Sequence, residues 1–154
     1  MIRFACYFAV LPLVIAAAFS NEASAQNCRA VAQQVAAATG AEIATSRAMD
    51  TFQLNHRAAP GGSQIVCGAP SIMFSAYSAA SSPAFVDYVT SAASAMTKSD
   101  ATLLRRTVEN CVASGNLSLD IPVGIDMRGI NVECLVSKRF GGSLSITIYR
   151  RRDF

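Results

Sequence analysis

The chain lacks the residue patterns of several common catalytic sites. It has one histidine, His56, so a nuclease mechanism that uses two histidines is excluded. It has no Cys-x-x-Cys pair, which rules out the usual ligand spacing of zinc sites and the redox motif of thioredoxin-like proteins. It also has no Gly-x-Ser-x-Gly turn of the kind that presents a nucleophilic serine in α/β-hydrolases. We therefore expect no catalytic residue, no metal ligand and no bound cofactor.

The single histidine is the centre of an alternative, enzymatic interpretation. A general base needs a positioned partner and a reacting group, and Asp50 and Glu133 are the acids considered as neighbours of His56. Nothing in the local sequence connects either acid to the histidine. A structural or solvated histidine is the favoured interpretation, and a small exported hydrolase with a site assembled around His56 is the alternative.

Two further patterns are typical of ligand sites but stand in the wrong context. Asp120 and Asp126 lie close together in the sequence, yet their spacing matches no calcium loop, so we expect solvated loop residues. The glycine pairs at 61–62 and 141–142 lack the strand-to-helix context of a phosphate-binding loop. Both pairs are predicted to form turns.

Charge is sparse and nearly balanced along the chain. Thirteen Lys and Arg residues against ten Asp and Glu residues give a net charge of +3, which does not point to nucleic acid as a partner. Basic residues gather near the C-terminus at 138–139 and 150–152. We expect them to mark a charged edge strand that discourages aggregation, and an anionic partner surface is the alternative.

The first 25 residues have the layout of a secretory signal peptide. A short start with Arg3 precedes an apolar run over 4–19, and a polar segment ends in Ala23-Ser24-Ala25. The apolar run is shorter than the about 20 residues needed to span a membrane. We expect residues 1–25 to be removed and residues 26–154 to form a single domain with no membrane span. That domain would be exported to a periplasm or to the extracellular space.

Cysteine usage supports the same destination. An even number of cysteines in an exported chain predicts two disulfides. A bridge needs Cα atoms about 5.5 Å apart, so it must join neighbouring elements. Of the three possible pairings we favour one bridge between helices and one between strands. Removal of the leader also removes Cys6. The four remaining cysteines would then pair as Cys28–Cys111 and Cys67–Cys134.

The clearest structural signal is a hairpin at the C-terminus, over 129–152. Apolar and polar residues alternate on both sides of the glycine pair at 141–142, which predicts two antiparallel strands. A hairpin is marginally stable alone in water, so the rest of the chain must cover and extend it. The predicted apolar faces are Ile130, Val132, Cys134 and Val136 on the first strand, and Leu144, Ile146 and Ile148 on the second.

Apolar periodicity and end signals predict three helices. The first follows the cap Asn27 and ends at Gly40, the second is capped by Ser82, and the third is capped by Ser99 and ends at Gly115. The predicted buried stripes are Cys28, Val31 and Val35; Phe85, Val89, Ala92 and Met96; and Leu104, Val108, Cys111 and Val112.

Weaker alternation predicts further strands within 41–56, at 64–67 and at 71–78, the last two forming one bulged strand or two. The segment 116–128 is expected to be a partly extended connection. Neighbouring strands joined by short loops favour an antiparallel sheet. The predicted fold is α+β, with a sheet of four to five strands, about three helices packed on one face, and two disulfides.

These features favour a small exported, disulfide-stapled binding or interaction protein that is not an enzyme. Its expected partner is a protein or another envelope component. An envelope structural factor without a specific ligand fits the same residues.

Overall fold

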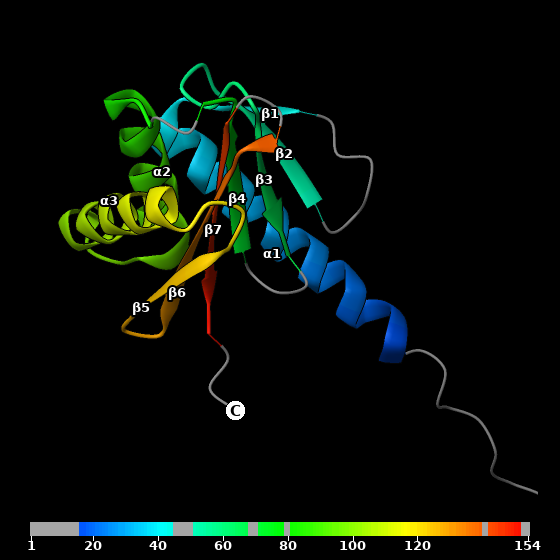
Figure 1. Ribbon diagram of the computed structural model, residues 1–154. Coiled ribbons are helices and arrows are strands. Elements are labelled where there is room, and N and C mark those ends of the chain that lie inside the picture. The colour runs from blue at the N-terminus through cyan, green and yellow to red at the C-terminus, as the bar shows by residue number, and fades with distance from the viewer. Residues whose placement is uncertain (1–15, 45–50, 68–70, 79–80, 140–141, 152–154) are drawn as a thin grey trace, which may run out of the picture.

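The computed structural model describes residues 16–44, 51–67, 71–78, 81–139 and 142–151, with side chains from Asn27 onward. Helix α1 is followed by four strands, then by two helices, and finally by three strands (Figure 1). The elements are α1 (Ala16–Thr39), β1 (Glu42–Ala44), β2 (Thr51–Asn55), β3 (Ser63–Val66), β4 (Ser71–Ala76), α2 (Pro83–Thr97), α3 (Ala101–Leu117), β5 (Val123–Met127), β6 (Ile130–Ser137) and β7 (Ser143–Arg150).

The strands form one antiparallel sheet in the order β1-β2-β3-β4-β7-β6-β5. The three helices cover one face of it, with α1 packed on α2 and α2 packed on α3. Helix α1 lies over β1 and β2, whereas α3 lies over β5 and β6 (Figure 1). The α+β class and the antiparallel sheet are therefore confirmed.

The predicted number of four to five strands is wrong, because the sheet has seven. The additional strands are the short β1 and the glycine-containing β5, which was expected to be a connection. Both lie at the edges of the sheet. Short strands and glycine are tolerated there because an edge strand pairs on one side only.

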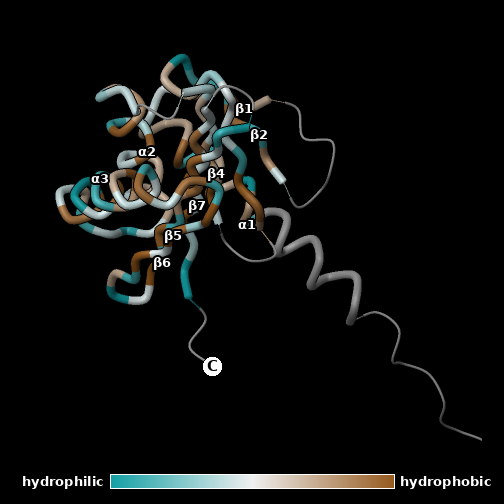
Figure 2. The backbone as a smooth tube through the Cα atoms, in the orientation of Figure 1, coloured by the Kyte–Doolittle hydropathy of each residue, from teal (hydrophilic) through white to brown (hydrophobic). Residues whose placement is uncertain are grey.

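The predicted C-terminal hairpin is confirmed by the pairing of β6 with β7. Ser137 lies opposite Ser143, and Ile130 lies opposite Arg150 at the other end of the ladder. Burial alternates along both strands, and every residue predicted to face the core is buried. Residues 140 and 141 lie outside the described part, so the turn prediction there stays a prediction. Figure 2 shows apolar segments in these strands and a hydrophilic C-terminal end of β7.

The helix ends follow the predicted signals in part. Ser82 caps α2, since its hydroxyl accepts the Phe85 N–H at 3.1 Å, and Pro83 occupies the first helical position. Gly40 ends α1 in a left-handed conformation (φ 73°). Asn27 does not cap α1 in the full chain, because the alanine-rich segment before it continues the helix back to Ala16.

Two predictions about α3 are wrong. Its N-cap is Asp100 rather than Ser99, because the Asp100 carboxylate accepts the Leu103 N–H at 2.8 Å. The helix also continues past Gly115 to Leu117. Gly115 is buried, and a Cβ added there would lie 3.1 Å from a methyl of Val136. The glycine therefore serves close packing of α3 on β6 rather than helix termination.

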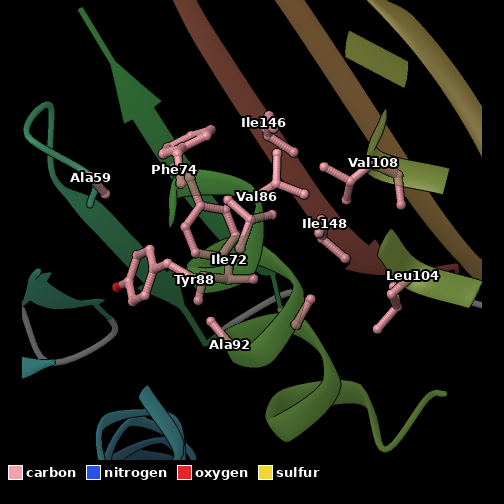
Figure 3. Packing of buried hydrophobic residues seen from close by; sticks show 14 of the residues in the cluster. Ala59, Ile72, Phe74, Val86, Tyr88, Ala92, Leu104, Val108, Ile146 and Ile148 are labelled. Atoms are coloured by element: carbon pink, nitrogen blue, oxygen red, sulfur yellow. The ribbon is translucent and has the colours of Figure 1, made fainter. Parts of the chain in front are cut away.

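The hydrophobic core fills the space between the helices and the sheet. Side chains from β4, β7, α2 and α3 meet there, as Figure 3 shows for Phe74, Ile146, Val86 and Val108. The four predicted residues of α3 and three of the four on α2 are fully buried, while Met96 is partly buried. The helical stripes thus pack as their periodicity predicts.

The predicted disulfide pairing is wrong. The structure pairs Cys28 with Cys67 and Cys111 with Cys134, with Cα atoms 5.6 and 5.8 Å apart. Each bridge joins a helix to the sheet. The predicted helix–helix bridge cannot form because α2 separates α1 from α3, and β4 and β7 separate the strand that precedes Cys67 from β6.

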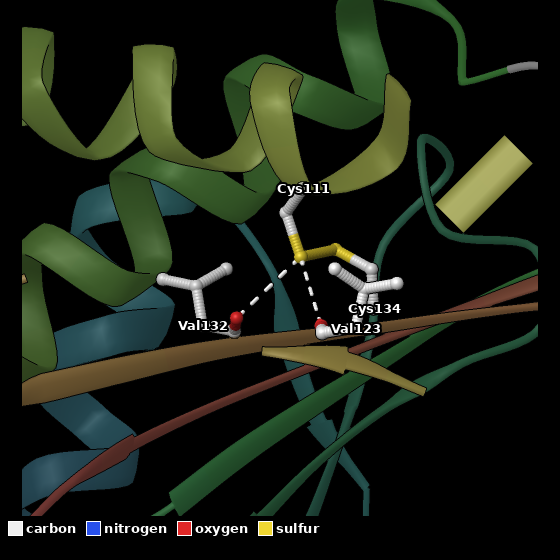
Figure 4. The surroundings of a disulfide bond; sticks show 4 residues. All are labelled: Cys111, Val123, Val132 and Cys134. Carbon is white, nitrogen blue, oxygen red and sulfur yellow. Dashed lines mark hydrogen bonds between the residues drawn. A yellow bond between two sulfur atoms is a disulfide. The ribbon is translucent and has the colours of Figure 1, made fainter. Parts of the chain in front are cut away.

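The Cys111–Cys134 bridge is fully buried between α3 and the sheet (Figure 4). Cys111 Sγ lies 3.5 and 3.4 Å from the carbonyl oxygens of Val123 and Val132, along the dashed lines of Figure 4. A bridged sulfur carries no proton, so in the oxidised protein these are packing contacts rather than donated hydrogen bonds.

Among the described residues, no helix combines the length and the apolar character that crossing a membrane would require.

Candidate functional site

The candidate site lies in the turn between β2 and β3. β2 ends at Asn55, and the turn closes through hydrogen bonds from the Ala59 N–H to the His56 carbonyl and from the Gly62 N–H to the Ala59 carbonyl. The backbone of Gly61 and Gly62 also bonds to Ser75 of β4. A Cβ on Gly61 would lie 2.6 Å from the Ser75 carbonyl oxygen, so only glycine fits there. The glycine pair at 61–62 is thus a turn, as predicted, and it fixes the position of His56.

Four side chains form a compact cluster behind this turn. His56 stacks on Tyr88 of α2, with ring centroids 4.2 Å apart and the rings 7° from parallel. The Tyr88 hydroxyl lies 2.6 Å from the Ser63 hydroxyl at the start of β3. Phe74 packs nearly perpendicular to the Tyr88 ring, with ring centroids 5.6 Å apart. The cluster therefore connects the surface histidine to the core.

The hydrogen bonds of the cluster have one consistent direction. Ser63 Oγ lies 3.0 Å from the Leu54 carbonyl oxygen, which can only accept, so the Ser63 proton is committed to it. Tyr88 must then donate its proton to Ser63. His56 Nδ1 accepts the Ala58 N–H at 3.2 Å, so a neutral imidazole carries its proton on Nε2.

Burial also affects the acidity of Tyr88. The residue is 3% exposed. Burial raises the pKa of its phenol above the usual value, and the Ser63 hydroxyl, which can turn to donate to the ionised phenol, offsets part of that rise. Tyr88 therefore stays protonated at neutral pH and serves as a hydrogen-bond donor rather than as a base.

Two open grooves meet at His56. One has a volume of about 630 Å³ and lies between the end of α1 and the turn after β2. The other, of about 650 Å³, lies between that turn and the first turns of α2. Four residues line both grooves: Thr39, His56, Arg57 and Pro60. The volumes of the two grooves are in the range of small-molecule sites.

Charged groups in the grooves are few. Arg57 is exposed and has no ion-pair partner among the described side chains. Glu42 lines the first groove, and Asp87 lines the second but pairs with Arg105. Arg57 is thus the cation available to a ligand beside His56.

The acids considered as partners for His56 do not join it. Asp50 lies outside the described residues. Glu133 lies opposite Gly124 and Thr147, and β3, β4 and β7 separate its strand from β2. The described residues therefore place no carboxylate in a hydrogen bond with the imidazole.

The other predicted candidates have local structural roles. Asp120 accepts hydrogen bonds from the Ser137 hydroxyl and the Lys138 N–H, and the Ser137 bond contributes most to lowering its pKa. Asp126 accepts from Asn131 and pairs with Arg151 at 2.9 Å. Within the described ranges, no three His, Cys, Asp or Glu residues are grouped so that they could hold a metal ion.

The interpretation of the C-terminal basic residues as a charged edge strand is wrong. β7 lies inside the sheet between β4 and β6. Arg150 instead donates to the Thr97 carbonyl at the end of α2, and Arg151 pairs with Asp126. These side chains join the end of β7 to neighbouring elements.

Sequence reasoning missed Tyr88, Ser63 and Arg57. A signal existed for Ser63, because the hairpin register places it between Leu54 and Phe74 on the core face. A buried hydroxyl requires a hydrogen-bond partner. Identifying Tyr88 as that partner requires knowing how α2 packs.

Comparisons with protein-family models, with curated proteins and with solved structures find no match.

Proposed function

We propose that the chain is a small exported binding protein, stapled by two disulfides, that holds a ligand in the grooves beside His56 without acting on it chemically. The main observation behind this proposal is that the reactive groups are already hydrogen-bonded to other groups of the protein. The Ser63 proton bonds to Leu54, the Tyr88 proton bonds to Ser63, and His56 Nδ1 is occupied by the Ala58 N–H.

The hydrolase alternative requires a nucleophile that His56 can activate. Ser63 is 3% exposed and its proton is directed to a backbone carbonyl. A general base must reach the proton that it abstracts. This geometry favours binding over catalysis. If replacement of His56 by alanine abolished a measurable hydrolytic activity of the purified chain, the alternative would replace this proposal.

The grooves favour a ligand with an anionic group. No described side chain forms an ion pair with the Arg57 guanidinium, and His56 and Thr39 line the same two grooves. A guanidinium recognises carboxylates through paired hydrogen bonds. The proposed ligand is therefore a carboxylate carried by a partner protein or another envelope component. The four paired cysteines support export to an oxidising periplasm or extracellular space.

The test is a titration of the purified chain with a panel of small carboxylates, such as N-acetyl amino acids and uronic acids. We expect saturable changes in the amide chemical shifts of Thr39, His56 and Arg57. Arg57→Gln is expected to weaken binding about tenfold or more, since a charged hydrogen bond contributes about 1.5–3 kcal/mol.

Arg128→Gln is the matched control, because Arg128 is an exposed arginine in the distant β5–β6 turn. Equal weakening by both variants would point to nonspecific attraction. A panel without any saturable shift would contradict the groove as a carboxylate site.

A further inference from the structure

Strand β5 presents a free edge of the sheet (Figure 1). In the part of the chain that the structure describes, β5 pairs with β6 and no strand pairs with its outer side. Arg128 and Gly129 join β5 to β6 as a two-residue turn with φ of 47° and 80°, which is the type I′ geometry.

This turn determines which backbone groups of β5 point outward. In such a hairpin the residues that flank the turn, Met127 and Ile130, form a hydrogen-bonded pair. Hydrogen-bonded pairs then alternate with non-bonded pairs along the ladder. The N–H and C=O groups of Gly124 and Asp126 therefore point away from the sheet, where the described structure gives them no partner.

Exposed aliphatic side chains lie beside the same edge. Leu117 is 89% exposed and Ile121 is 61% exposed, which makes them the most exposed large aliphatic residues of the described chain. Leu117 ends α3, the helix that covers β5 and β6. Arg105 marks the side of α3 that faces α2, because it pairs with Asp87. Leu117 lies about a third of a turn away from that side, since each residue of a helix advances by about 100°.

The turn before β5 holds Ile121 in its exposed position. Asp120 has a positive φ of 63°, which is strained for a residue other than glycine. Its N–H donates to the Val136 carbonyl, its carboxylate accepts from Ser137, and the Ile121 N–H donates to the Ser118 carbonyl. The exposure of Ile121 is therefore a feature of an ordered turn. The unpaired backbone groups of an edge strand form a template for pairing with another chain, and the exposed Leu117 and Ile121 lie next to β5 along the chain.

We propose that β5 pairs with β5 of a second copy of this chain, antiparallel and about a twofold axis through Ile125. This axis places Gly124 of each copy opposite Asp126 of the other. The outward groups of these residues would then form four backbone hydrogen bonds, and the two Ile125 side chains would meet at the axis. The arrangement is self-complementary, as a twofold interface requires.

The charges and the proline at this edge favour that register. Centring the axis on Asp126 would oppose two carboxylates, which is destabilising. Centring it on Gly124 would place Asp126 opposite Pro122, which has no N–H to donate. The register through Ile125 avoids both the carboxylate pair and the proline, and it places each Asp126 opposite Gly124 of the other copy.

The helices fit the same symmetry. Paired strands lie about 4.8 Å apart, and packed helices lie about 8–10 Å apart. Because each α3 overlies β5 and β6, the two copies of α3 would run antiparallel across the axis. Leu117 of one copy would approach the start of α3 in the other, near Leu103, which is partly buried. The pairing would thus cover aliphatic surface that is exposed in the single chain.

The test combines sedimentation with amide hydrogen exchange on the oxidised, purified chain. We expect a dimer, with slow exchange at Gly124 and Asp126 that becomes slower as the protein concentration rises. Leu117→Lys and Gly124→Pro are expected to raise the dimer dissociation constant at least tenfold, with unchanged circular dichroism. Tyr77→Lys is the matched control, because Tyr77 is 72% exposed and follows β4, away from this edge.

A monomer at all concentrations would overturn the proposal, and so would a dimer in which the Gly124 and Asp126 amides exchange as freely as exposed amides. If Gly124→Pro disturbs folding, Leu117→Lys carries the test, since its side chain is exposed in the single chain. The proposal is independent of the His56 grooves, and Arg57→Gln is expected to leave the dimer unchanged.

Discussion

Tyr88 joins the hydrophobic core to the grooves around His56. Its ring contacts both Phe74 and His56, and its hydroxyl reaches Ser63 in a core position of the sheet. A tyrosine suits this position because its ring packs with apolar groups while its hydroxyl forms the hydrogen bond that the buried Ser63 requires.

We predict that Tyr88 ionises at a higher pH than an exposed tyrosine. Burial raises the pKa of its phenol in the folded chain, so the unfolded chain ionises first, near pH 10. The contribution of this group to stability is therefore complete below about pH 10 and is lost as the pH rises beyond it. An ultraviolet phenolate titration of the folded chain should show a late step that is missing in Tyr88→Phe.

Ser63→Ala provides the matched variant for that titration. Once Tyr88 ionises, the Ser63 hydroxyl can turn from the Leu54 carbonyl and donate to the phenolate, which lowers the pKa of Tyr88. Removal of this hydroxyl should therefore move the late step to still higher pH. Identical curves for the wild type and Tyr88→Phe would contradict the assignment of the step to Tyr88.

At the scale of the element, helix ends depend on which side chain reaches the first free N–H groups. Ser82 and Asp100 both accept a backbone N–H three residues ahead, whereas Ser99 contributes its carbonyl to the Ser94 hydroxyl. Ser99 and Asp100 are both suitable N-cap residues, but only one of them can occupy the N-cap position. The non-helical backbone conformation of Asp100 places it there.

We predict that Ser82→Ala and Asp100→Ala each lower the free energy of unfolding by about 1 kcal/mol. Ser99→Ala should lower it by much less, because the described structure gives the Ser99 hydroxyl no hydrogen bond. Urea unfolding followed by circular dichroism measures all three. A larger loss for Ser99→Ala than for Asp100→Ala would show that the cap lies one residue earlier.

At the scale of the whole molecule, the two disulfides attach the outer helices to the sheet. Cys28–Cys67 spans 39 residues and Cys111–Cys134 spans 23. The chain-entropy model gives about 4 and about 3.5 kcal/mol for loops of these lengths. Two such contributions are comparable to the net stability of a domain.

We predict that reductant opens Cys28–Cys67 before Cys111–Cys134. Cys67 is partly exposed, whereas both cysteines of the second bridge are fully buried. Non-reducing peptide mapping at increasing reductant should show this order, and the melting temperature should fall in two stages. Recovery of peptides that link Cys28 to Cys111 would contradict the pairing.

The elements with strong local patterns were predictable. The β6–β7 hairpin, the Ser82 cap and the buried stripes of α2 and α3 follow from residues adjacent along the chain. The candidate site was predictable only at His56. Its stacking on Tyr88 joins residues 32 positions apart, and no local pattern records that contact.

The sequence by itself determined the elements with regular apolar periodicity, the number of cysteines available to pair and the layout of the predicted leader, because these depend on the order of residues along one segment. Tertiary structure alone decided the cysteine pairing, the place of β7 inside the sheet and the seven-strand count. The physical reason is that each of these depends on which elements become neighbours. α2 packs between α1 and α3, which leaves each outer helix beside the strands that it bridges.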